Sequence, residues 1–284
     1  MILILILGLA AGGGLVGVFT LSAADLIWGE SIGVVEIKGV IQESEPIIRT
    51  LINFSRSKNV KAIILRIDTP GGGVAATQEI YKEIIRAREK KKIIASLGSM
   101  ATSGGLYVAA AADRVMANPA TVTGSIGVIM QLVNVENLLE KVGVRSVVIK
   151  SGPYKDMGSI TRTMKEEEKK LLLDVVNQLH HQFVRDLAKA RHLEEGKVSA
   201  LADGRIFTGE EAIHLGLVDE LGNFRDAVDA AKKLAGLKGS PKLIYPRKRD
   251  SLLKELLFNR GPLKLIPEWM DKPLSFQYIY LPGV

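Results

Sequence analysis

Hydrophobic residues along the chain fall into short, β-branched runs that alternate with longer segments of helical character. Runs typical of buried strands lie at residues 32–37, 62–67, 93–97, 115–117, 126–130 and 147–149. Helical spacing or runs of small residues predict helices over residues 74–92, 103–112, 135–142, 165–191 and 224–235. Strands that alternate with helices are typical of a layered α/β domain with mainly parallel strands.

The first 24 residues form an apolar segment without a charged side chain, and the first charge is Asp25. A helix of this length would reach about 36 Å, enough to cross a hydrocarbon core of about 30 Å. The alternative is a cleaved secretory signal peptide, because Ser22, Ala23 and Ala24 resemble a cleavage site, but no Lys or Arg precedes the apolar run. We therefore expect one uncleaved N-terminal transmembrane helix.

The charges that follow this segment indicate its orientation. Five acidic residues are opposed by a single lysine there: Asp25, Glu30, Glu36, Glu43 and Glu45, with Lys38. Because basic flanks favour the cytoplasmic side, we expect a single-pass protein of the cell membrane, with its N-terminus in the cytoplasm and its globular part on the extracytoplasmic side. The expected organisation is an anchor over residues 1–24, one domain over 25–240 and a basic C-terminal extension over 241–284.

The composition excludes several kinds of site. The 284 residues include no cysteine, which removes disulfides, iron–sulfur clusters and a cysteine nucleophile, and the four histidines show no metal-ligand spacing, so we expect no metal. The net charge of +7 comes from Lys232–Lys272, where 11 basic residues face 4 acidic ones. Such a segment can contact phospholipid or nucleic acid, but without a nucleic-acid motif a solvated surface is the favoured interpretation, and no nucleic-acid partner is expected.

Two loops rich in glycine and serine follow predicted strands. The first, Asp68–Gly73, ends in three glycines, which can adopt positive φ and present free N–H groups. It suits an oxyanion hole or a phosphate cradle, or it is only a tight turn, and it lacks the P-loop spacing. The second, Gly98–Tyr107, places Ser103 at the expected start of a helix, near the positive end of the helix dipole. Ser103 is therefore either a nucleophile or an N-cap serine.

A serine nucleophile needs a base, and no histidine lies in a comparable loop. Lys155 lies in a loop with Gly152 and Pro153 that follows an apolar run. A lysine that is shielded from water has a lowered pKa and can accept a proton as a neutral amine. A solvated lysine of no catalytic role is the other interpretation.

Five segments, in this order, resemble the signal peptide peptidase A family of membrane-anchored serine proteases, which use a Ser/Lys dyad on a ClpP/crotonase-like fold. They are DTPGGG at 68–73, ATSGGLYV at 101–108, TGSIGV at 123–128, SGPYKD at 151–156 and DGRIFTGEEA at 203–212. Together with the anchor they span about residues 1–237, and the residues after Pro241 match no motif of the family.

The resemblance implies a set of site residues. Ser103 would be the nucleophile, Lys155 the general base and Ser125 the hydroxyl that orients Lys155. The oxyanion hole would use backbone N–H groups from Gly71 or Gly72 together with Gly104. The run of three glycines leaves the choice between the first two open. No cofactor is implied.

The resemblance also implies a membrane-bound serine endopeptidase. Its substrates would be cleaved signal peptides, other peptides released from the membrane or unfolded segments, bound as extended strands in an apolar groove. Two other classes remain open. A crotonase-type acyl-CoA enzyme would use the glycine turn but neither the anchor nor the Ser/Lys pair. A catalytically silent membrane scaffold would keep the fold without needing Ser103 or Lys155.

The chain holds one copy of each motif, whereas longer relatives in the family carry the unit twice and take the serine and the lysine from different halves. We therefore expect a cyclic homo-oligomer with active sites between protomers, in which Ser103 of one protomer meets Lys155 of its neighbour. The apolar segment Val108–Ala112 is expected to help bury this contact.

Overall fold

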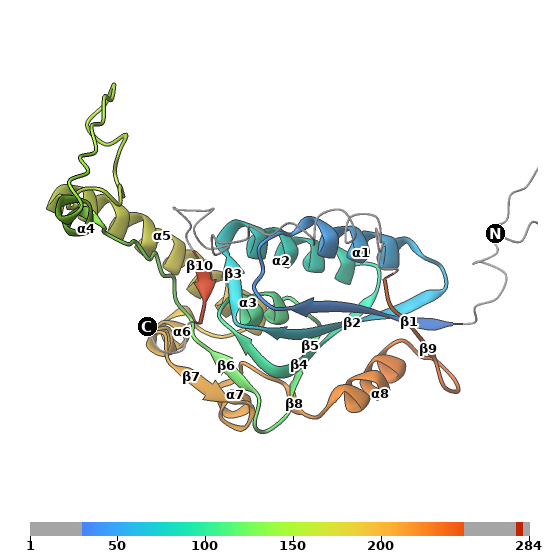
Figure 1. Ribbon diagram of the computed structural model, residues 1–284. Helices are drawn as coiled ribbons and strands as arrows, with labels where there is room; N and C mark the ends of the chain where they lie inside the picture. Colours follow the sequence, from blue (N-terminus) through green and yellow to red (C-terminus); the bar gives the residue numbers. More distant parts are fainter. Residues whose placement is uncertain (1–29, 247–276, 281–284) are drawn as a thin grey trace, which may run out of the picture.

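The computed structural model describes residues 30–246 and 277–280 (Figure 1). The predicted transmembrane helix over residues 1–24 lies outside the described residues. Within the described part, every helix is too short or too polar to span a bilayer.

Strands and helices alternate through most of the described chain. The strands are β1 (Ser31–Lys38), β2 (Val60–Thr69), β3 (Gly71–Gly73), β4 (Lys92–Thr102), β5 (Arg114–Ala117), β6 (Val122–Gly124), β7 (Ile206–Thr208), β8 (Glu220–Leu221), β9 (Lys242–Ile244) and β10 (Gln277–Ile279). The helices are α1 (Glu45–Arg56), α2 (Val74–Arg88), α3 (Gly104–Ala110), α4 (Glu136–Lys141), α5 (Glu166–Arg191), α6 (Glu195–Leu201), α7 (Gly209–Leu215) and α8 (Phe224–Leu234).

The main sheet has the order β7–β6–β4–β2–β1–β9, and β5 pairs with both β4 and β8. Every pair in it is parallel except β6 with β7. A second, two-stranded sheet pairs β10 with β3 in antiparallel orientation. The prediction of an α/β fold with mainly parallel strands is confirmed, and this architecture is consistent with a ClpP-like fold.

The central strands are apolar on both faces because helices cover both sides of the sheet (Figure 1). In β2, Ile63, Leu65 and Ile67 belong to the core that contains residues of α1, α2, α3 and α5. The alternate residues Ala62 and Ile64 pack in a second cluster with α8. Since successive side chains of a strand point to opposite faces, burial on both faces explains the unbroken apolar runs in the sequence.

Three predicted elements differ from the structure. The helix predicted over 74–92 ends at Arg88, and β4 already begins at Lys92. Residues 126–130 form no strand beyond a single bridge between Ile129 and Gln277. The run 147–149 is also outside any strand, and Ile149 is 98% exposed. A β-branched run becomes a strand only where another strand pairs with it; in the described chain residues 126–130 have a single bridge and residues 147–149 have no strand partner.

The C-terminal region contributes two strands to these sheets. From the predicted extension over 241–284, β9 pairs with the edge of β1, and β10 pairs with the glycine strand β3. The expectation that Val108–Ala112 helps to bury a contact between protomers is wrong. These residues are already buried inside the chain, because α3 lies beneath α2 and α5 and above the sheet.

Candidate active site

Two serines of the predicted site follow neighbouring parallel strands. β4 pairs with β6 so that Thr102 lies opposite Gly124, and Ser103 and Ser125 are the next residues of the two strands. The N–H of Ser103 donates a hydrogen bond to the carbonyl oxygen of Gly124 at 2.7 Å. The sheet register therefore brings Ser103 and Ser125 together at the carboxyl ends of β4 and β6.

Both serines have a strained backbone. The φ angles are 51° at Ser103 and 50° at Ser125, and the third non-glycine residue with positive φ in the described chain is His192, which caps α5. A positive φ is uncommon for side-chain-bearing residues and costs on the order of 1–3 kcal/mol, so it persists only where the surroundings enforce it. Here the strand register and the start of α3 enforce it at Ser103.

The hydroxyl of Ser103 is buried and unpaired. Its side-chain oxygen has no hydrogen-bond partner within the described residues, and the residue is 1% exposed. The hydroxyls of Thr102 and Thr77 are buried without a partner as well. A buried donor without a partner costs about 1–3 kcal/mol, so the Ser103 hydroxyl is available to a partner that the described residues do not supply.

Sequence analysis did not single out Thr77 or Thr102. Thr77 lies in the first turn of α2, and its Oγ1 is 3.0 Å from the position that a Cβ on Gly104 would take. The available signal is its position just after the glycine run in the sequence.

The glycine turn lies directly against the start of α3. Gly71 has φ +107°, and a Cβ there would lie 1.9 Å from the carbonyl oxygen of Tyr278 and 2.8 Å from the backbone N of Gly104. Gly104 is the first residue of α3, so its N–H has no partner within the helix. The backbones of Gly71 and Gly104 therefore meet beside Ser103.

The N–H groups of the three glycines have different surroundings. The N–H of Gly73 donates to the carbonyl oxygen of Ile41 at 2.9 Å. The N–H of Gly71 donates to Thr69 Oγ1 at 3.0 Å, and Gly72 faces β10 across the antiparallel pair. The N–H groups of Gly71 and Gly73 therefore both have partners within the chain, and the choice between Gly71 and Gly72 as oxyanion donor stays a prediction.

β10 lies as an extended strand along this glycine turn. Tyr278 is opposite Gly72 in the antiparallel register, and the N–H of Tyr280 donates to the carbonyl oxygen of Pro70 at 2.8 Å. The Tyr278 ring is fully buried, with ring centroids 5.4 Å from Tyr107 and 4.7 Å from Phe183. The edge of β3 next to the site thus accepts an extended peptide segment with an aromatic side chain.

Tyr107 fixes α3 to the long helix α5. Its hydroxyl donates to the Asp186 carboxylate at 2.5 Å. Burial, and then the hydrogen bond with Asp186, raises the pKa of Tyr107 well above its usual range. Tyr107 is therefore a neutral donor at any working pH, and it holds α3, the helix that Ser103 caps.

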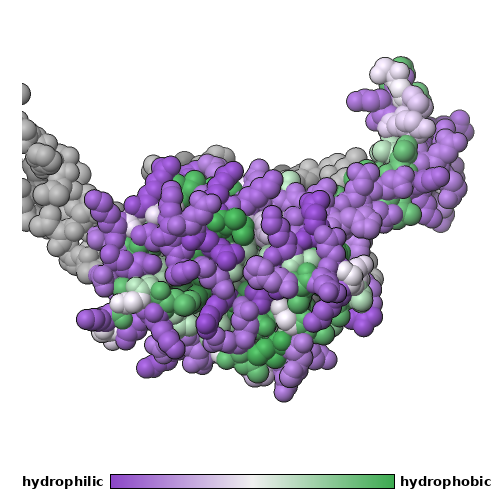
Figure 2. Space-filling view, turned by 180° about the vertical axis from the view of Figure 1, so that it is seen from behind, coloured by the Kyte–Doolittle hydropathy of each residue, from purple (hydrophilic) through white to green (hydrophobic). Residues whose placement is uncertain are grey.

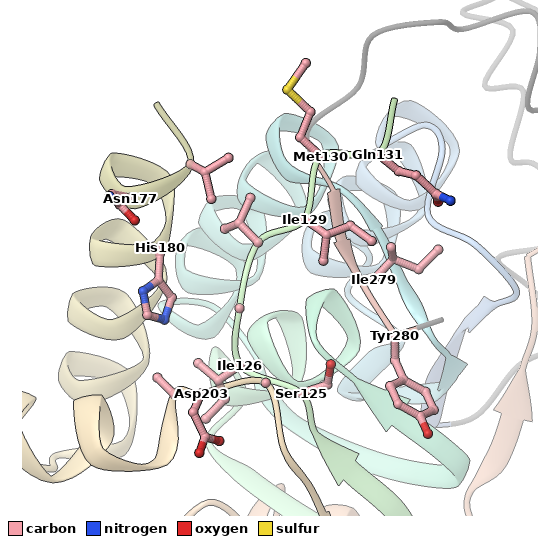
Figure 3. Close-up of a pocket in the computed structure, with 15 residues that line it drawn as sticks. Ser125, Ile126, Ile129, Met130, Gln131, Asn177, His180, Asp203, Ile279 and Tyr280 are labelled. Carbon is pink, nitrogen blue, oxygen red and sulfur yellow. The ribbon is translucent and has the colours of Figure 1, made fainter. Parts of the chain in front are cut away.

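A cavity of about 700 Å³ opens beside Ser125. Figure 3 shows its walls, which include Ser125, Ile129, Asn177, His180, Asp203 and Ile279. His180, from α5, has a buried Nε2 without a hydrogen-bond partner. It is the one imidazole among the described residues that line this cavity, so it is the alternative base within the chain that the sequence analysis passed over. No group of acidic or histidine side chains in the described residues could hold a metal ion.

Lys155 lies far along the chain on a projecting arm. We define the arm as residues 134–165, which contain α4 and the segment that leads to α5, and Figure 1 shows it extending away from the sheet. The Lys155 side chain is exposed and its backbone N–H donates to Gly152 O at 3.2 Å. Ser103 Oγ has no partner, so one copy of the chain does not bring Lys155 and Ser103 together.

Comparisons with known proteins show which families and proteins the chain is similar to. The profile of "Peptidase family S49" matches residues 85–238, and that of "Clp protease" matches residues 34–124. A Synechocystis protein named "Putative protease slr0021" is 44% identical over 73% of this chain and 76% of its own length. The Enterococcus faecium "Putative signal peptide peptidase SppA" is 36% identical over 77% of this chain and 62% of its own length. The Arabidopsis thaliana "Serine protease SPPA, chloroplastic" is 35% identical over 68% of this chain but only 29% of its own length.

Proposed function

The chain belongs to peptidase family S49 and is a serine peptidase similar to signal peptide peptidase A, and on this premise we propose that Ser103 is its nucleophile and that Lys155 of a neighbouring copy is its base. The observation that carries the proposal is the state of Ser103. It is buried, strained and unpaired at the start of α3, where a strand-to-helix corner presents its hydroxyl.

The proposed reaction is acyl transfer to Ser103. The neutral amine of Lys155 takes the hydroxyl proton while the oxygen attacks a peptide carbonyl carbon. The ammonium of Lys155 then gives this proton to the nitrogen of the leaving peptide as the C–N bond breaks. Water, deprotonated by the same amine, attacks the ester, and Ser103 leaves with a proton. Lys155 is exposed in one copy, so the neighbouring copy has to shield it from water.

Backbone N–H groups would stabilise the tetrahedral intermediate. The N–H of Gly104 is free of the helix, and the glycine turn lies against it, so Gly104 with Gly71 or Gly72 forms the oxyanion hole. Ser125 is held next to Ser103 and would accept or donate one hydrogen bond to orient the incoming lysine.

A second copy of this chain is the source of the lysine. The arm carries Val147 and Ile149, which are 85% and 98% exposed, just before Lys150. Figure 2 shows hydrophobic residues on the arm among hydrophilic ones. Adjacent apolar side chains that are this exposed typically mark a contact with another protein. The match to the Clp protease profile also favours an assembly of several copies. We propose a ring in which each arm packs on the next protomer beside the Ser125 cavity.

The proposed substrates are peptides in extended conformation. β10 shows that a strand can pair with β3 beside Ser103, and the cavity next to it has apolar walls that include Ile126 and Ile129. Signal-peptide remnants fit this chemistry because they are short and apolar. We also propose an N-terminal membrane anchor and an extracytoplasmic catalytic domain, which would place the site where such remnants are released.

The test is covalent labelling by a peptidyl phosphonate, which reacts only with an activated serine. We expect one label per chain, on the peptide that contains Ser103, and none on Ser103→Ala. Ser99→Ala is the matched control, because Ser99 lies in β4 four residues before Ser103 but is exposed, and it should be labelled normally. A label on another serine would overturn the assignment, and an intact Ser103 that resists the probe would favour the silent scaffold.

A further inference from the structure

The segment that carries Lys155 is fixed by a partly buried ionic bridge, in which the side chains of Arg162, Asp156 and Glu168 are 24%, 10% and 1% exposed. Arg162 lies between two carboxylates, each six residues away in the chain. Its Nε donates to Asp156 Oδ2 at 2.8 Å, and its Nη2 donates to Asp156 Oδ1 at 3.0 Å. The same Nη2 also donates to the backbone oxygen of Asp156 at 3.2 Å. Arg162 therefore binds both the side chain and the backbone of Asp156, the residue that follows Lys155.

The other side of Arg162 is tied to the start of α5. Its Nη1 and Nη2 donate to the two carboxylate oxygens of Glu168 at 2.8 and 2.5 Å. Glu168 is 1% exposed, and its Oε2 also accepts the N–H of Lys165, the N-cap of α5, at 3.0 Å. A continuous path of charge-assisted bonds thus runs from α5 through Glu168 and Arg162 to Asp156.

The bridge lies where the arm joins the first turn of α5. Burying charged groups carries a desolvation cost that an apolar contact avoids, so such a network is weak evidence for stability alone. Bidentate contacts between a guanidinium and a carboxylate do impose a fixed geometry. The pKa of Asp156 lies well below its usual range because Arg162 and then Lys150 bind it, and Arg162 and the Lys165 N–H lower that of Glu168 to about 2. Both carboxylates therefore remain ionised wherever a peptidase would work.

We propose that Arg162, held between Asp156 and Glu168, is the positioning residue that presents Lys155 to the neighbouring Ser103. The inference rests on the proposed function. The bridge fixes the backbone at residue 156 relative to the rigid helix α5, so the flexible Lys155 side chain starts from a defined place.

The bridge has a second consequence for Lys155. Asp156 is its neighbour in sequence, and a free carboxylate there would attract the Lys155 ammonium and oppose the neutral form that a base requires. Arg162 and Lys150 both bind this carboxylate, so its negative charge is already compensated. The bridge therefore both positions Lys155 and compensates the negative charge of the neighbouring Asp156.

The test separates activity from stability in the full-length, assembled enzyme. In Arg162→Met with Glu168→Met, both charges of the Arg162–Glu168 contact are removed together, while Lys150 still pairs with Asp156. We expect thermal stability and ring assembly close to wild type, kcat reduced about 100-fold as for a misplaced catalytic group, and KM little changed. Arg162→Lys keeps the positive charge but not the bidentate contact of the guanidinium. Its kcat should therefore lie between that of the wild type and that of the double variant.

The matched control is Arg191→Met at the opposite end of α5. Arg191 binds Asp219 through two nitrogens, at 3.0 and 2.5 Å, in a bidentate pair of which the Arg191 side chain is buried and the Asp219 side chain is half-buried. Breaking it should lower stability and leave kcat unchanged. The proposal is overturned if the Arg162→Met, Glu168→Met protein has the same kcat as the wild type. If Lys155→Ala itself is active, the Ser/Lys dyad fails as well. If Lys155→Ala is inactive and the Arg162 variants are active, only the positioning role fails.

Discussion

At Gly71 the surrounding backbone leaves no space for a side chain. In Gly71→Ala the new methyl group would lie 1.9 Å from Tyr278 O and 2.8 Å from Gly104 N, at a φ of +107° that alanine rarely adopts. Alanine keeps the backbone N–H, but the clash would move the turn away from Gly104, so we expect kcat on an apolar peptide ester to fall about 100-fold, as when one oxyanion donor is lost. Gly73→Ala is the matched control, because its methyl group would stay 3.7 Å from Ile41 O. Equal activity of the two variants would exclude the glycine turn from the oxyanion hole.

The identity of the base can be decided between Lys155 and His180. If Lys155 of a neighbour is the base, Lys155→Ala should be inactive, His180→Gln should keep its activity, and kcat/KM should rise into the alkaline range because only the neutral amine accepts a proton. If His180 at the Ser125 cavity is the base, the results for the two variants should be reversed.

At the scale of elements, β10 lies on the edge of β3 that an extended substrate would use. Deleting residues 277–284 should therefore lower KM for an apolar peptide and leave kcat unchanged, because a substrate strand no longer displaces the chain's own strand. Thermal stability should fall at the same time, since the buried Tyr278 ring is lost from its cluster with Tyr107 and Phe183. Deleting only residues 281–284 keeps β10 and is the control. An equal KM for the two truncated proteins would contradict this use of the β3 edge.

The segment 151–165 should loosen in acid. The pKa values of Asp156 and Glu168 are lowered in the folded chain, so their bonds to Arg162 stabilise it above the unfolded carboxylate value of about 4. That stability is lost as the pH falls toward the folded pKa of Glu168, about 2. Amide protection factors over 151–165 should be constant above about pH 5 and decline below about pH 4. In the Arg162→Met, Glu168→Met protein they should depend much less on pH.

The success of sequence analysis depended on how each element is stabilised. The strands β1, β2 and β4 are buried on both faces, so their apolar runs are long enough to recognise. The three-residue strands β3, β6 and β10 exist because neighbouring strands pair with them, and three residues carry no readable period. The run 147–149 has the composition of a strand but no partner in the described chain, so that prediction was wrong.

The same distinction applies to the site. The chemical types of Ser103, Ser125 and Lys155 were identified from loops and motifs. Their relative position depends on sheet register, which places Ser103 beside Ser125, and on the arm, which carries Lys155 away from both. The unpaired Thr77 hydroxyl and the His180 ring face the site only because α2 and α5 are packed there. Positions set by packing between distant segments leave no local pattern in a sequence.

At the scale of the whole molecule, the separation of Ser103 from Lys155 leads to a complementation experiment. Ser103→Ala and Lys155→Ala proteins should each be inactive, since each lacks one partner of every site. When the two are unfolded, mixed equally and reassembled, about one quarter of the interfaces in a head-to-tail ring should pair an intact Ser103 with an intact Lys155. Activity should return to about that fraction of the reassembled wild type. A mixture of Ser103→Ala with the Ser103→Ala, Lys155→Ala double variant contains no intact Ser103 and should stay inactive. If the first mixture is also inactive although mass measurement shows mixed rings, the base must come from the same chain as Ser103, and His180 becomes the residue to examine because it lines the cavity beside Ser125.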